Sequence, residues 1–122
     1  MIDQLIQEIS QQNPLVWQEK TELTSLLFNI KKRTEQISLS LSQERWMAVA
    51  VHLLAFIKRM EKGESLPPIE AEVWEEVSDE MKEVSRLVLE AYGHHNGRNI
   101  CNTEILLLAL HFETAKMEQQ GE

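Results

Sequence analysis

The sequence predicts an all-α fold for this chain. Apolar residues recur at three- and four-residue spacing through almost all of it, as in helices whose apolar stripe faces a shared core. No segment shows the alternation of apolar and polar residues that is typical of a strand. The 122 residues, of which 43% are hydrophobic and 26% charged, suffice for one soluble domain with a core of its own.

A short first helix is expected from Ile2 to Gln12. Its apolar side consists of Ile2, Leu5, Ile6 and Ile9. The helix should stop before Asn13-Pro14, because proline disfavours helical geometry in the residue that precedes it. A helix of this length is not stable alone, so it either covers the core or extends a contact between subunits.

A second helix is expected from Val16 to Leu39, and a third from Gln43 to Glu61. The apolar stripe of the second helix consists of Leu23, Leu26, Leu27, Ile30 and Ile37. That of the third consists of Trp46, Val49, Ala50, Leu53, Phe56, Ile57 and Met60. Ser42 is placed to cap the start of the third helix, and Gly63, with prolines after it, is a typical signal for its end.

The second half of the chain predicts a short helical piece and two further helices. The short piece covers residues 69–77, and Ser78 can cap a helix that ends near Tyr92, before a loop over residues 93–99. The residues expected to be buried in that helix are Met81, Val84, Leu87, Val88 and Ala91. The last helix begins at Asn102 or Thr103, and a polar tail follows over residues 117–122. Its expected inward residues are Leu106, Leu107, Leu110 and His111.

Charge and cysteine content exclude several classes of protein. A net charge of −8 with only 12 lysines and arginines argues against direct nucleic-acid binding, which needs a clustered positive surface. The single cysteine, Cys101, excludes an internal disulfide. Without a secretory signal or an apolar stretch of about 20 residues, we expect no membrane contact and a cytoplasmic protein.

Two histidines lie inside the most apolar helical runs. His52 has only Ala48, Val49, Ala55 and Phe56 one turn before and after it, so no local acid or base activates it. A histidine in such a run is most often a core residue that is hydrogen-bonded to a carbonyl. His111 has the same setting in the last helix, at the edge of its apolar stripe, and the repetition suggests a site.

Each histidine shares its helix face with a charge two turns away. Arg59 follows His52 by seven residues, and Glu104 precedes His111 by seven. If the two helices pack antiparallel with the histidines together, Arg59 faces Glu104. Alternatively, each charge only complements the dipole of its own helix, Arg59 near a C-terminus and Glu104 near an N-terminus.

These residues carry a family resemblance. The run from His52 to Arg59, followed about fifty residues later by the run from Thr103 to Phe112, resembles the phosphotransferase-system regulation domain, or PRD. Nearly the whole chain from Val16 to Lys116 fits it. The resemblance implies a five-helix bundle that usually dimerises, here with an additional short N-terminal helix. We therefore expect a single PRD-like domain over residues 1–122, with its core at about 16–116.

The resemblance also implies roles for the site residues. His52 takes the position of the first phosphoacceptor and His111 that of the second, with Arg59 and Glu104 as supporting residues. The phosphate donor would be the phosphocarrier protein or a sugar permease component. The family commonly has an acidic residue before its first histidine, whereas this chain has Val51. That departure makes His111 the stronger candidate.

The expected function is that of a stand-alone PRD module in bacterial transcriptional control, since no nucleic-acid-binding module accompanies it here. A phosphoryl group on either histidine would change dimer or partner contacts, because it brings about −1.5 to −2 charges onto an apolar surface. The alternative is a helical interaction or assembly domain that has lost its phosphoacceptor function. No enzyme activity, cofactor or metal site is expected, because catalytic motifs are missing and His94, His95 and Cys101 match no zinc pattern. Trp17, Trp46 and Trp74 are interpreted as packing or interface aromatics.

Overall fold

The computed structural model describes residues 1–121, which form six helices and no strand. The helices are α1 (Ile2–Gln12), α2 (Trp17–Gln36), α3 (Gln43–Lys62), α4 (Ala71–Glu75), α5 (Asp79–Asn96) and α6 (Asn102–Gln120). The all-α fold predicted from the sequence is confirmed. The first helix has the predicted bounds, and the other five match the expected bundle in number and order.

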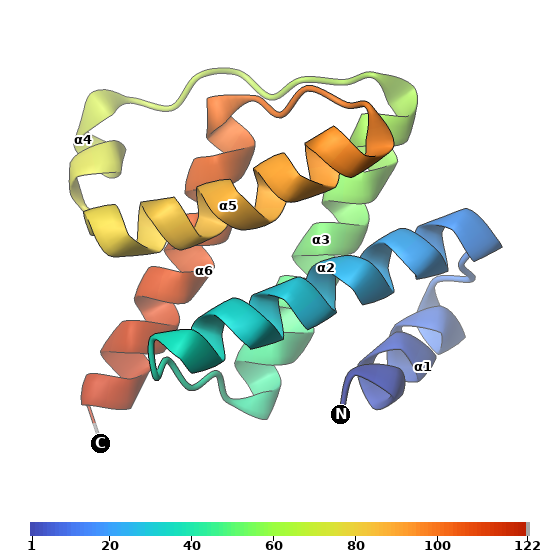
Figure 1. Cartoon of the computed structure of the whole chain (residues 1–122), viewed down its shortest axis with the longest axis horizontal. Coiled ribbons are helices and arrows are strands. Elements are labelled where there is room, and N and C mark those ends of the chain that lie inside the picture. The colour runs from blue at the N-terminus through green and yellow to red at the C-terminus, as the bar shows by residue number, and fades with distance from the viewer. Residues whose placement is uncertain (122) are drawn as a thin grey trace.

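The four long helices form two antiparallel pairs that cross. In Figure 1, α2 and α5 run in opposite directions in front, and α3 and α6 run in opposite directions behind them. The pairs are joined by contacts of α2 with α3 and of α5 with α6, while α1 packs against both α2 and α3. Packing rather than local propensity therefore holds the short α1 in place, because its four apolar residues are buried.

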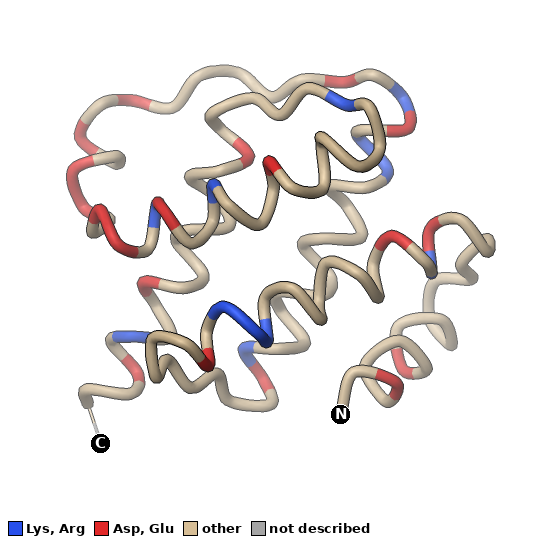
Figure 2. The backbone as a smooth tube through the Cα atoms, in the orientation of Figure 1, with Lys and Arg blue, Asp and Glu red and all other residues tan. Residues whose placement is uncertain are grey.

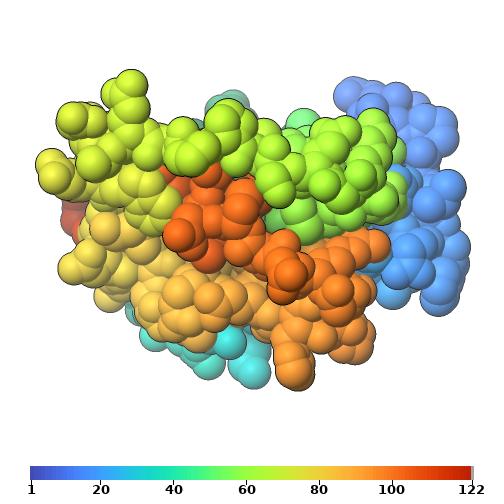
Figure 3. Space-filling view, turned by 90° about the horizontal axis from the view of Figure 1, so that it is seen from above, coloured from blue at the N-terminus to red at the C-terminus, as the bar shows by residue number. Residues whose placement is uncertain are grey.

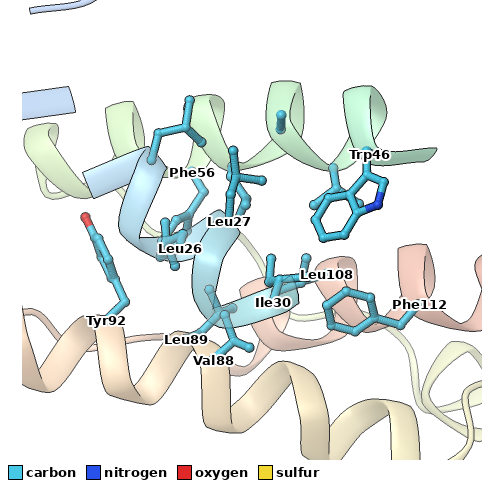
Figure 4. Close-up of a cluster of buried hydrophobic side chains, with 14 of the residues drawn as sticks. Leu26, Leu27, Ile30, Trp46, Phe56, Val88, Leu89, Tyr92, Leu108 and Phe112 are labelled. Carbon is cyan, nitrogen blue, oxygen red and sulfur yellow. The ribbon is translucent and has the colours of Figure 1, made fainter. Parts of the chain in front are cut away.

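The core lies where the two pairs cross. Figure 4 shows Ile30 of α2, Trp46 of α3, Leu89 of α5 and Phe112 of α6 around one cluster. The stripes predicted for the second and third helices are buried, except that Ile37 and Met60 are only half-buried. Because the inner faces of α3 and α6 pack into this core, a surface site on these helices must lie on their outer flanks.

The predicted capping residues begin and end α3 and begin α5. The Ser42 hydroxyl accepts a hydrogen bond from the Arg45 amide at 3.1 Å, and the Ser78 hydroxyl accepts one from the Met81 amide at 3.4 Å. Gly63 ends α3 with a left-handed φ of 68°. These caps define the ends of α3 and the start of α5. The ends of α3 in turn determine where His52 lies along the axis of that helix.

The second helix and the short fourth helix are shorter than predicted. α2 ends at Gln36 instead of Leu39, because Ser38 adopts a left-handed φ of 56° and the Leu39 amide turns back to donate to the Thr34 carbonyl at 2.9 Å. α4 covers only Ala71–Glu75 of the expected 69–77 segment. Neither change moves the helices that carry the histidines.

The end predicted for α5 is wrong. The helix continues through Gly93 to Asn96 and stops at Gly97, which has a left-handed φ of 64°. Gly93 is needed for close approach, because a Cβ there would lie 2.5 Å from the Arg98 carbonyl oxygen and 3.0 Å from Ile100 Cγ1. The chain that returns toward α6 packs directly on this helical glycine.

The inward faces of α5 and α6 also differ from prediction. Ala91 is exposed, whereas Leu89 and Tyr92 are buried. In α6 the expected Leu107 and Leu110 are only half-buried. The face of α6 that packs inward consists of Ile105, Leu106, Leu108, Ala109, Phe112 and Ala115. Apolar residues surround this helix almost completely, so periodicity alone did not determine which side packs.

The last helix continues into the segment expected as a tail. α6 runs to Gln120, and the Gln119 side chain accepts a hydrogen bond from the Ser40 amide at 2.7 Å. The same side chain donates to the Ser38 carbonyl at 3.1 Å. The end of α6 is therefore bound to the loop between α2 and α3.

A long connection from α3 to α4 crosses the top of the bundle. Figure 3 shows it as a green band lying against the orange segment that enters α6. The Thr103 hydroxyl donates to the Pro67 carbonyl at 2.9 Å, which joins the two segments at the first turn of α6. Glu104 is the next residue, so this hydrogen bond also fixes its position at the start of α6.

Acidic residues gather over α4 and the first turn of α5, as Figure 2 shows. They are Glu70, Glu72, Glu75, Glu76, Asp79 and Glu80. This acidic surface repels the phosphate backbone of a nucleic acid. None of the helices in residues 1–121 is apolar over a length that would cross a membrane.

Candidate functional site

His52 and His111 are in contact across the α3–α6 pair. Their ring centroids lie 5.2 Å apart and the ring planes are inclined by 53°. Both side chains are half-buried. The antiparallel register predicted from the seven-residue spacings is therefore confirmed at its centre.

The Arg59–Glu104 pair confirms the same register two helical turns away from the histidines. Arg59 Nε and Nη2 donate to the two carboxylate oxygens of Glu104, each at 2.8 Å. The Glu104 side chain is 0% exposed and that of Arg59 is 19% exposed. The carboxylate raises the pKa of Arg59, and this two-bond geometry suits a guanidinium better than an ammonium group. The pair holds α3 and α6 in one relative position.

A second ion pair on the other side of the histidines was missed by the sequence analysis. Arg45 Nε donates to Glu118 Oε1 at 3.0 Å. Arg45 precedes His52 by seven residues and Glu118 follows His111 by seven, so the spacing that located Arg59 and Glu104 would have found this pair if extended in the opposite direction. The α3–α6 contact is thus a ladder of three rungs, with the histidines in the middle.

Arg45 also reaches the histidine pair. Its Nη1 lies 3.3 Å from His111 Nδ1. A guanidinium has only donors, so His111 Nδ1 must carry a lone pair in this arrangement and the ring proton sits on Nε2. The contact thus brings a cation within hydrogen-bond distance of His111 and defines the tautomer of that ring.

The surroundings keep both imidazoles neutral near pH 7. Burial, the nearby His111 and Arg59 together lower the pKa of His52 from its usual 6.5 to about 4. Burial and the Arg45 charge also lower the pKa of His111. A neutral imidazole has a free lone pair, which is the form that can attack a phosphorus atom.

The residue before His52 is Val51, which is 51% exposed. Ala55, one turn further along α3, is also exposed. The outer flank of His52 is therefore apolar, with neither a carboxylate nor an amide at these two positions.

Comparison with known proteins identifies the family. The model of the PRD domain matches residues 24–115, three quarters of the chain. The matched range contains both histidines and all the charged residues of the ladder except Glu118. The chain belongs to the PRD family. The crystal structure of a PRD-containing transcription regulator from Lactobacillus casei ATCC 334 superposes with a TM-score of 0.77, at 20% sequence identity, over 94% of this chain and 95% of that one. At this identity the likeness concerns the fold alone. No curated protein matches the chain.

The PRD is a regulatory domain that is typically non-catalytic. It is linked to transcription regulators under control of the phosphotransferase system, and components of that system phosphorylate PRDs. The recognition of a PRD from the two histidine motifs is thereby confirmed. The roles of individual residues stay predictions.

The other residues singled out in the sequence lie away from the histidine pair. A cavity of about 350 Å³ between α2 and α5 is lined by Trp17, His95 and Glu22, among others. The buried Glu22 carboxylate is fully engaged there by Tyr92, Arg98 and Gln18. Of the three tryptophans, Trp46 is buried, Trp74 is half-buried and Trp17 is 76% exposed, so Trp17 is not a core residue. Within residues 1–121, no three metal-binding side chains gather at one point.

Proposed function

We propose that this PRD is a regulatory module in cytoplasmic, phosphotransferase-system-linked control of transcription, and that it responds to phosphorylation of its histidine pair. The observation that carries the proposal is the contact between His52 and His111 at the centre of the α3–α6 ladder. Two neutral, half-buried imidazoles supply nucleophiles without any adjacent base, which suits transfer from a reactive phosphohistidine on a donor protein. That donor is the phosphocarrier protein or a sugar permease component.

His111 is proposed as the principal phosphoacceptor and His52 as the second. Arg45 Nη1 lies 3.3 Å from His111 and offers a cation to an incoming phosphate. The pKa of His52 is lowered to about 4, mainly by burial, and the apolar Val51 lies next to it in the chain. A phosphoryl group on His52 would meet a less polar environment, and its transfer is therefore expected to be slower.

The response is proposed to occur through contacts between subunits. The exposed Val51 and Ala55 flank the site with apolar surface that a second copy of the chain can cover. A phosphoryl group there brings about −1.5 to −2 charges and three strong acceptors, which must be desolvated or moved. Across a two-fold axis each modification occurs twice, so the effect falls directly on the dimer equilibrium.

Intact-mass measurement tests the proposal. The protein is incubated with phosphoenolpyruvate, the kinase of the system and the phosphocarrier protein, and the gain of a phosphoryl group is followed over time. His111→Ala should lose most of the transfer, whereas His94→Ala, which alters an exposed histidine at the end of α5, should retain it. Equal transfer to wild type and His111→Ala would contradict the assignment of His111.

A helical interaction or assembly domain without phosphoacceptor function is the second candidate. The observation that favours it is Val51, since an apolar, half-exposed residue beside His52 suits a permanent contact better than a regulated one. No transfer from the phosphocarrier protein or from any sugar permease component, together with a stable dimer in light scattering, would favour this candidate over the first.

A further inference from the structure

The two arginines of the ladder differ in how firmly they are held. Arg59 makes two hydrogen bonds to a carboxylate with no exposed surface, while Arg45 makes one to Glu118, whose side chain is 48% exposed. Taking Arg59 away would leave a buried charge without a partner, which is costly, whereas Glu118 can be hydrated when Arg45 leaves. Only Arg45 is free to change partner.

The position of Arg45 matches this freedom. Its guanidinium lies between Glu118 Oε1, at 3.0 Å from Nε, and His111 Nδ1, at 3.3 Å from Nη1. Nδ1 is the ring nitrogen that holds the lone pair in this arrangement, so a phosphoryl group bonded to it would lie beside this guanidinium. Arg59 was the sequence-based candidate for binding the new phosphate, but its commitment to Glu104 favours Arg45 instead.

We propose that Arg45 is the phosphate-binding residue of this site, exchanging Glu118 for the phosphoryl group as His111 is modified. This rests on the proposed function. In the transfer step a lone pair of the neutral His111 ring attacks phosphorus, and a new N–P bond forms as the donor's P–N bond breaks. The bond pair returns to the donor nitrogen, and His111 keeps one proton on its other ring nitrogen. Arg45 binds the phosphoryl oxygens, which carry the charge during and after the transfer.

The exchange has a consequence at the end of α6. Glu118 loses its cation and lies near a new negative charge, so the last turn of α6 loses one of its ties to α3. The remaining ties are the Gln119 hydrogen bonds to Ser40 and Ser38. Phosphorylation is thereby converted into loosening of the C-terminal turn, on the same side of the bundle as the α2–α3 loop.

The test compares rates of phosphorylation in four variants. Both the phosphocarrier protein and phosphoramidate, which transfers its phosphoryl group with loss of ammonia, serve as donors, and intact mass gives the initial rate. Arg45→Gln should slow the modification of His111 by about tenfold or more, because the transition state loses one charge-assisted contact. Arg45→Lys should recover most of that rate because the charge is kept. Glu118→Gln should react at least as fast as wild type, and Arg86→Gln, on the exposed face of α5, should be unchanged.

A second measurement separates phosphate binding from a structural role. Hydrogen exchange of the amides in residues 117–120 should accelerate on phosphorylation of the wild type and should already be fast in unmodified Glu118→Gln. Circular dichroism establishes that each variant is folded. Wild-type rates in Arg45→Gln with both donors would overturn the inference. If wild type accepts no phosphoryl group from either donor, the proposed function itself fails, which is a different result.

Discussion

Arg59 and Glu104 form a two-bond ion pair that no water reaches on the carboxylate side. Each nitrogen–oxygen distance is 2.8 Å, and the Glu104 side chain has no exposed surface. Arg59 lies in the last turn of α3 and Glu104 in the first turn of α6, so each charge also complements the dipole of its own helix. The sequence left two alternatives, an interaction with the helix dipoles and an ion pair between the helices. The structure is compatible with both at once.

Reversing either charge of this pair should destabilise the fold. Arg59→Glu or Glu104→Arg places like charges together in a buried position, and each should lower the free energy of unfolding by at least about 3 kcal/mol. The double variant restores opposite charges but sets both against the helix dipoles, so about half of the loss should return. Urea denaturation followed by circular dichroism measures all four proteins.

A matched control uses an exposed arginine. Arg86 pairs with Glu83 and Glu90 on the surface of α5, and Arg86→Glu should leave the unfolding midpoint close to that of wild type. If the double variant of Arg59 and Glu104 is no more stable than the worse single variant, the pair does not set the register of α3 and α6.

The low pKa of His52 predicts a specific pH dependence of stability. Its pKa is about 4 in the folded chain and 6.5 in the unfolded chain, so between these values the unfolded chain binds more protons. The His52 contribution is therefore complete above pH 6.5 and is lost as the pH falls toward 4. At pH 5 the loss should be about 1–2 kcal/mol relative to pH 7.

The measurement compares wild type with His52→Gln at pH 7 and pH 5. Carboxylate titration affects both proteins alike, so the difference in their free energies of unfolding reports the titration of His52 together with its effect on the neighbouring His111. The stability of wild type should fall more than that of the variant over this interval. Parallel pH profiles would show that the His52 ring is more hydrated than its position between α3 and α6 implies.

The sequence was sufficient to predict that the two histidines, and Arg59 with Glu104, lie together, because their positions follow one simple rule. Seven residues are close to two helical turns, so spacing alone placed Arg59 and Glu104 on the faces of His52 and His111. The same rule contained Arg45 and Glu118, but no motif called attention to them. Whether Arg45 or Arg59 is free to change partner depends on how deeply its carboxylate partner is buried, which spacing does not encode.

Elements whose local signals were ambiguous were the ones predicted poorly. α6 is apolar nearly all round, so the face that packs inward was decided by tertiary contacts with α5 and α3. Glycine is a typical residue for a helix end, but Gly93 lies inside α5. The backbone at Arg98 packs so closely on this position that a Cβ would clash with it. A glycine that permits close approach and one that ends a helix are identical in sequence.

The two glycines near the end of α5 should therefore respond differently to alanine. In Gly93→Ala the new Cβ would lie 2.5 Å from a backbone oxygen that cannot rotate away, and the free energy of unfolding should fall by about 2–3 kcal/mol, more than in Gly97→Ala. In Gly97→Ala nothing lies within 4 Å, and the cost of about 1 kcal/mol comes from the left-handed φ alone. Urea denaturation gives both values, and an equal effect of the two changes would contradict the close-packing role of Gly93.

Introducing an acidic residue before His52 should increase reactivity at that position. In a His111→Ala background, Val51→Asp places a carboxylate next to His52. The negative charge should raise the pKa of His52, but only slightly, because residue 51 is half-exposed and adjacent side chains on a helix point in different directions. A less depressed pKa makes the ring more basic, and phosphoryl transfer to His52 should become faster. NMR titration of the imidazole measures the pKa, and intact mass after incubation with the phosphocarrier protein measures the transfer. Val51→Asn, which adds polarity without charge, should leave both quantities near those of the parent, and faster transfer in both variants would attribute the gain to polarity alone.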